Sequence, residues 1–136
     1  MIFDIDVAGR SGRGTHQRLD GLWSNGGGLL TGCSAGAMIL GEEFFGFPGW
    51  KWQAGFKFLP ETIVVPHYNE IPESLIAPMR FMLGKELTIL GVEGNTALVQ
   101  KGEEYEVVGS GGVIVWNGAG KTRHTRGPMP YWRNGR

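Results

Sequence analysis

The sequence has few of the features that mark metal-binding, secreted or membrane proteins. Its 136 residues include one cysteine, Cys33, which cannot form an internal disulfide. Its Cys and His residues lack the spacing of zinc ligands, and no apolar run approaches the length of a membrane span. The N-terminal residues also lack a basic segment followed by a long apolar core. These absences predict a cytoplasmic protein with no metal and no membrane contact.

A net charge is also absent. Thirteen basic and thirteen acidic side chains cancel, so the overall charge predicts no affinity for nucleic acid. Residues 121–136 are the exception, because they carry five Lys or Arg side chains and no acidic one. We interpret this segment as a solvated basic tail of irregular structure. Residues 1–120 are long enough for one compact domain with a modest core.

Glycine is abundant, with 24 residues that fall mostly between short apolar runs. The most informative of these turns lies in residues 29–40, where an apolar run meets small residues and then a helical apolar pattern. Ser34 lies between Gly32 and Gly36 with one residue on each side, which matches the G-x-S-x-G nucleophile elbow. Such a turn would expose the Ser34 hydroxyl. The backbone N–H of Ala35, at the start of the following helix, would face an oxyanion formed beside Ser34.

The remaining pattern predicts an α/β domain. Two successive strand–helix units near the N-terminus favour parallel pairing of their strands. We therefore expect a mostly parallel sheet flanked by helices, with antiparallel strands at the C-terminal end. Residues 44–58 are rich in aromatic side chains without a regular period, and we interpret them as an ordered loop. The expected strands are 2–7, 29–31, 63–65, 88–92, 96–99, 105–108 and 113–116, and the expected helices are 15–23 and 72–83.

A serine hydroxyl needs a neighbouring base to become a nucleophile. Of the three histidines, His67 directly follows the expected strand 63–65. Because parallel strands have their carboxyl ends at one edge of a sheet, we expect His67 to lie near Ser34. His16 and His124 fall in a first helical turn and in the basic tail, where we expect them to be surface residues.

Three segments together resemble one family of enzymes. They are residues 32–38 (GCSAGAM), 65–72 (VPHYNEIP) and 90–98 (LGVEGNTAL). In order and spacing they are similar to the dipeptidase E and cyanophycinase family, serine peptidases with a class I glutamine amidotransferase-like fold. The resemblance implies that Ser34 is the nucleophile and His67 the base. It also implies a peptide or peptide-like substrate and no cofactor.

The resemblance also suggests the remaining site residues. Gly12 lies in a stretch similar to the one whose glycines donate to the family's oxyanion hole. The family's acid would fall near residues 49–52, where this sequence has no carboxylate. Between Ser34 and His67 the substitutes are Glu42, Glu43 and Glu61, of which we select Glu43 because it can fold back over the mouth of the elbow.

Family members are longer at the N-terminus, so the resemblance implies a chain without the first strands of the sheet. An exposed sheet edge would then favour self-association into a homo-oligomer. An alternative to a peptidase is a catalytically decayed or truncated relative that acts as a binding module. An amidotransferase that uses Cys33 is less favoured, because the Cys33 side chain should point away from the site.

Overall fold

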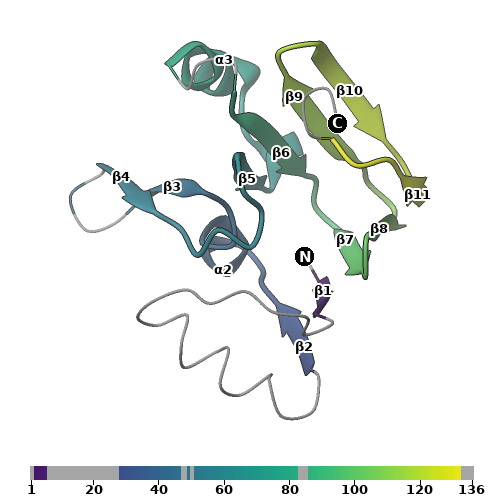
Figure 1. Ribbon diagram of the computed structural model, residues 1–136. Coiled ribbons are helices and arrows are strands. Elements are labelled where there is room, and N and C mark those ends of the chain that lie inside the picture. Colours follow the sequence, from purple (N-terminus) through teal and green to yellow (C-terminus); the bar gives the residue numbers. More distant parts are fainter. Residues whose placement is uncertain (1, 6–27, 47–48, 50, 83–85, 133–136) are drawn as a thin grey trace.

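The computed structural model describes residues 2–5, 28–46, 49, 51–82 and 86–132 (Figure 1). Its strands form a five-stranded sheet, a four-stranded sheet and a two-stranded hairpin. The five-stranded sheet has the order β11 (Gly127–Met129), β8 (Glu104–Gly109), β7 (Thr96–Lys101), β1 (Ile2–Ile5), β2 (Gly28–Thr31). The four-stranded sheet has the order β10 (Gly120–His124), β9 (Val113–Asn117), β6 (Thr88–Val92), β5 (Thr62–Pro66). The hairpin consists of β3 (Glu43–Gly46) and β4 (Lys51–Ala54).

The helices are short. The α2 helix (Ala35–Met38) follows β2, and α3 (Glu73–Met82) follows the single 3₁₀ turn η1 (Tyr68–Glu70). Together η1 and α3 form the crossover between β5 and β6, which pair in parallel. The negative charge of Glu73, in the first turn of α3, interacts favourably with the partial positive charge of the helix N-terminus and so stabilises the helix.

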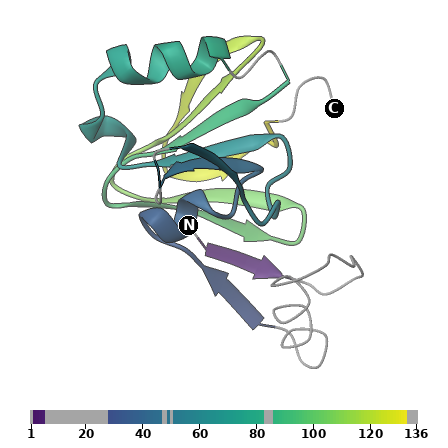
Figure 2. The same cartoon turned by 90° about the vertical axis from the view of Figure 1, so that its left-hand side faces the viewer.

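The four-stranded sheet is covered on both faces because its strands alternate two apolar sets of side chains. One set packs against the five-stranded sheet and includes Val64, Leu90 and Val115. The other set includes Ile63, Ile89 and Ile114 and packs with Ile76 of α3. The result is three layers: α3, the four-stranded sheet and the five-stranded sheet (Figures 1 and 2).

The expectation of a mostly parallel, helix-flanked sheet is wrong. Among the eight strand pairs of the described residues, only β1–β7 and β5–β6 are parallel. The first two strands, β1 and β2, pair antiparallel rather than parallel. From β6 to β11, successive strands are separated by only two or three residues, which is too short for a crossover helix. The described α-helices contain only four and ten residues.

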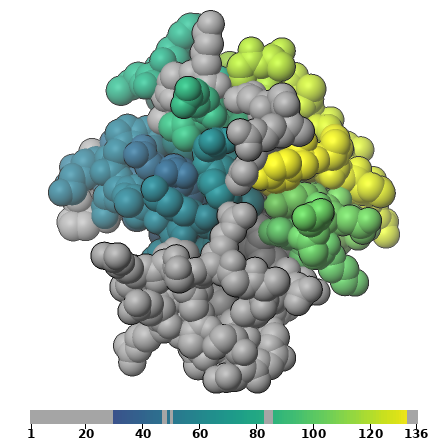
Figure 3. All heavy atoms as spheres, viewed as in Figure 1, coloured from purple at the N-terminus to yellow at the C-terminus, as the bar shows by residue number. Residues whose placement is uncertain are grey.

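Two expectations about irregular segments are also wrong. Within 44–58, the strands β3 and β4 form a hairpin, in which the cross-strand partners Phe45 and Trp52 place their ring centroids 5.5 Å apart. The basic segment after residue 120 contains β10 and β11, and Figure 3 shows its yellow atoms against the green of β7 and β8. Trp132 anchors this segment, because its buried Nε1–H donates to Thr62 Oγ1 at 3.2 Å. The prediction of an irregular tail rested on the cationic side chains and gave no weight to the apolar residues between them.

Several other expectations are confirmed. The strands expected near residues 29–31, 63–65, 88–92 and 105–108 are present, as is the helix before residue 83. The helix expected at 15–23 lies outside the described residues. In the described part of the chain, no helix is long and apolar enough to cross a membrane.

We predict that Trp132→Ala lowers the free energy of unfolding by about 3–5 kcal/mol, because it leaves a cavity and removes a buried hydrogen bond. Phe81→Ala is the control, since Phe81 is 86% exposed on α3, whereas Trp132 is 5% exposed. Urea denaturation measures both variants. Equal stabilities for the two would contradict the packing of the C-terminal segment.

Candidate active site

The turn between β2 and α2 has the backbone geometry of a nucleophile elbow. Ser34 precedes α2 with φ 48° and ψ −123°, and its side chain is exposed. A positive φ is strained for a residue with a Cβ, so the surrounding turn must hold it. Ala35 is the first residue of α2, so its N–H has no partner within the helix and faces the N-terminal end of α2.

The close packing of this turn depends on Gly32 more than on Gly36. A Cβ at position 32 would lie 2.5 Å from the carbonyl oxygen of Gly36 and 3.0 Å from Leu40 Cδ1. A Cβ at position 36 would meet no atom within 4 Å. The first glycine of the motif is therefore required by space, and the second is not.

His67 lies directly beyond the end of β5, and its Nε2 is 2.9 Å from Ser34 Oγ. The Ser34 hydroxyl can donate to Nε2 when the imidazole proton is on Nδ1. Nδ1 of His67 lies 3.4 Å from Oε2 of Glu70, three residues further along the chain. The structure thus brings Ser34, His67 and Glu70 into one row on the surface. His67 also has a positive φ, 53°.

The reason that Ser34 and His67 meet differs from the one expected. Their strands, β2 and β5, belong to different sheets, so they do not share a sheet edge. Instead, the chain after α2 runs back along β5, where the Glu42 N–H donates to the Thr62 carbonyl oxygen at 2.7 Å. This path places the start of α2 near the end of β5.

The other site residues expected from the sequence lie elsewhere. Glu42 pairs with Lys57 at 2.8 Å and accepts a hydrogen bond from the Glu61 N–H at 3.1 Å. This hydrogen-bonded carboxylate raises the pKa of Lys57. Glu43 begins β3, where its charge also acts on Lys57. Gly12 lies outside the described residues. Sequence reasoning missed Glu70, whose position three residues after His67 on a helical turn was the available signal.

A surface pocket of about 430 Å³ lies beyond η1, between α3 and β10, and its lining includes Tyr68 and Asn69. Its charges are already paired, since Lys121 Nζ lies 2.8 Å from Glu73 Oε1. This contact raises the pKa of Lys121. We therefore assign the pocket no part in the chemistry. Among the described residues, no cluster of His, Cys, Asp and Glu side chains could hold a metal ion.

Comparison with known proteins gives one structural relative to report. No family model matches the sequence, and no curated protein matches it. A solved peptidase from an acI-B1 actinobacterium is similar, with 26% sequence identity and a TM-score of 0.56. The match covers 74% of this chain and 44% of the peptidase, so this chain spans less than half the length of that protein.

We predict opposite effects for the two glycines of the elbow. Gly32→Ala should lower the melting temperature, because its Cβ meets the backbone of Gly36. Gly36→Ala should leave it unchanged or raise it, since alanine favours a helix over glycine by up to about 1 kcal/mol. Differential scanning calorimetry measures both. A Gly32→Ala protein as stable as the wild type would contradict the geometry of the turn.

Proposed function

We propose that the protein is a serine-type peptidase in which Ser34 is the nucleophile and His67 the general base. The observation that carries this proposal is the 2.9 Å contact between Ser34 Oγ and His67 Nε2 at a strained, exposed turn. The similarity to a solved peptidase supports the same reaction class. We further propose membership of the dipeptidase E and cyanophycinase family, on the three sequence segments that resemble it.

In the proposed reaction, Ser34 Oγ attacks the carbonyl carbon of a peptide bond while His67 Nε2 takes the hydroxyl proton. The N–H of Ala35 donates to the oxyanion, and Gly12 is the proposed second donor. His67 then returns the proton to the leaving amine, which departs and leaves an acyl-enzyme. Water, deprotonated by His67, hydrolyses the ester and restores Ser34. These steps need no metal or organic cofactor.

We place Glu70 as the residue that orients His67. An acceptor at Nδ1 keeps the proton on that nitrogen, so that Nε2 is free to accept from Ser34. The Oε2 of Glu70 is 3.4 Å from Nδ1. Glu43, the residue selected from the sequence, begins β3, where its negative charge acts on Lys57.

Labelling with a fluorophosphonate tests the proposal without knowledge of the substrate. We expect the wild type to be labelled, Ser34→Ala to be inert, and Cys33→Ala to label like the wild type. Cys33 is exposed and adjacent in sequence, so it is the matched control for the nucleophile. An unlabelled wild type would favour the alternative, a relative that binds peptides without cleaving them. Loss of labelling in Cys33→Ala but not in Ser34→Ala would contradict the assignment of Ser34 as the nucleophile.

We predict that Glu70→Gln slows labelling and peptide hydrolysis, because glutamine no longer attracts the proton to Nδ1. Removing the acid of a buried triad costs about 10⁴-fold in turnover. Since Glu70 has 66% of its side chain exposed, we expect a smaller loss here. The control Glu43→Gln should keep the wild-type rate. A lower rate in Glu43→Gln together with an unchanged rate in Glu70→Gln would indicate that Glu43, and not Glu70, orients His67.

A further inference from the structure

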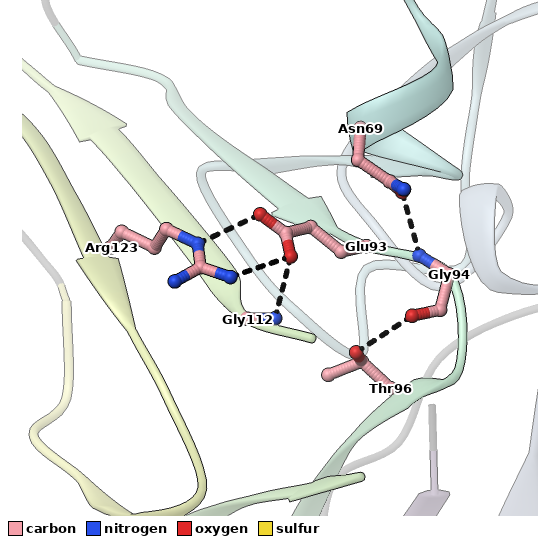
Figure 4. Close-up of polar contacts among 6 residues, drawn as sticks. All are labelled: Asn69, Glu93, Gly94, Thr96, Gly112 and Arg123. Carbon is pink, nitrogen blue, oxygen red and sulfur yellow. Dashed lines mark hydrogen bonds and ion pairs between the residues drawn. The ribbon is translucent and has the colours of Figure 1, made fainter. Parts of the chain in front are cut away.

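The turn that carries His67 follows β5, at one edge of the four-stranded sheet, and a connected set of polar contacts links it to β10 at the other edge. We propose that Asn69, Gly94, Glu93 and Arg123 form a brace that positions His67 toward Ser34 (Figure 4). This inference rests on the proposed function. Asn69 and Arg123 are positioning residues here, since neither touches Ser34 or a reacting atom in the proposed reaction.

The first link of the brace joins the His67 turn to the end of β6. Asn69, two residues after His67, accepts a hydrogen bond on its Oδ1 from the N–H of Gly94 at 2.8 Å. The carbonyl oxygen of Gly94 in turn accepts from the Thr96 hydroxyl at 3.0 Å. Gly94 is thus fixed from both sides, and it fixes Asn69.

The second link joins Gly94 to β9 and β10 through the preceding residue, Glu93. Its carboxylate accepts hydrogen bonds from Nε and Nη2 of Arg123, both at 2.8 Å, and from the N–H of Gly112, also at 2.8 Å. The backbone of Glu93 also donates to the Gly112 carbonyl oxygen at 3.0 Å. Such a bidentate pair fixes direction as well as distance. The donation from Arg123 lowers the pKa of Glu93, so the carboxylate is charged at neutral pH.

His67 needs such support because its backbone is strained. Its φ of 53° is unfavourable for a residue with a Cβ and persists only where neighbouring contacts hold it. One side of the turn is held by the ring of Tyr68, which packs against Gly91 where no Cβ has room. The other side is held by Asn69. A shift of the turn by about 1 Å would misplace Nε2, and misplacements of that size cost on the order of 10²-fold in rate.

The chain offers a matched control in the same segment. Arg126 lies three residues after Arg123 and is exposed between β10 and β11. Lys121 of β10 is a poorer control, because its Nζ lies 5.9 Å from the centroid of the Tyr68 ring, which holds one side of the turn. Arg123→Gln and Arg126→Gln each remove one exposed cation from this segment. A general effect of surface charge or of strand stability therefore appears in both variants, and an effect on His67 appears in one.

The experiment compares Asn69→Leu, Asn69→Asp, Arg123→Gln and Arg126→Gln with the wild type. We expect Asn69→Leu and Arg123→Gln to slow fluorophosphonate labelling by about 10- to 100-fold. Asn69→Asp keeps an acceptor for the Gly94 N–H and should label at nearly the wild-type rate. Arg126→Gln should label as the wild type does. Circular dichroism at the assay temperature ensures that each variant is folded.

A second readout does not depend on catalysis. The ¹Hε1–¹³Cε1 signal of His67, assigned with His67→Ala, reports the position of the ring. It should shift in Asn69→Leu and Arg123→Gln and stay in place in Arg126→Gln. Unchanged His67 signals and labelling rates in Asn69→Leu would overturn the brace. A wild type that is not labelled but whose His67 signal moves in Asn69→Leu would contradict the peptidase and retain the brace.

The pH dependence of stability tests the ion pair of the brace. The charged groups that face Glu93 in its pocket are Arg123, Lys121 and Glu73. Because the folded-state pKa of Glu93 lies below its ordinary value of 4.5, its pairing stabilises the fold above that pH and is lost as pH falls through the lowered pKa. The wild type should melt above Arg123→Gln at pH 7, with the difference closing in acid. A pH-independent difference would overturn the pairing.

Discussion

The hydrogen bond between Ser34 and His67 depends on two residues that are both held at positive φ, in turns that belong to different sheets. Neither conformation is favoured by the residue itself, so both must be imposed by packing. On the Ser34 side, the close approach of Gly32 to Gly36 forms the turn. On the His67 side, Tyr68 is buried and Asn69 is hydrogen-bonded to Gly94. The proposed chemistry is therefore a property of the interface between layers.

The layers themselves explain why the turns can be so tightly held. The alternation along β5, β6 and β9 buries apolar side chains on both faces of the four-stranded sheet. A slip in register would exchange these two sets of side chains and mismatch the close packing on both faces. The ends of the strands, where His67 and Glu93 lie, are consequently fixed relative to one another. Polar contacts at these ends then add direction to a position that apolar packing has already set.

Local features were predictable from the sequence, and long-range ones were not. The strand at 63–65 and the turn around Ser34 follow from short patterns of apolar and small residues. The pairing of strands does not, because fully apolar strands are common to parallel sheets and to layered antiparallel ones. The proximity of Ser34 and His67 was expected from a shared sheet edge, yet it arises from the path of the chain after α2. The prediction of an irregular tail after residue 120 was wrong because Trp132 is held by a hydrogen bond to Thr62, which lies 70 positions earlier in the sequence.

Glu70 and Arg123 illustrate a different limit. A glutamate three residues after a histidine is common on surface turns, and an arginine on an edge strand is common as a solvated charge. Their partners become visible only when the turn after β5 and the end of β10 are placed in space. The resemblance to a peptidase family included Glu93 and Gly94 in one of its segments, but a sequence segment does not say which contacts its residues make.

A crystal structure of the fluorophosphonate-treated protein tests most directly whether His67 activates Ser34 and the N–H of Ala35 binds the oxyanion. We expect a phosphorus bonded to Ser34 Oγ, a phosphoryl oxygen about 2.7–3.1 Å from the backbone nitrogen of Ala35, and His67 Nε2 within hydrogen-bond distance of the adduct. An adduct on another residue, or on Ser34 with its phosphoryl oxygen directed into solvent and His67 turned away, would contradict these assignments.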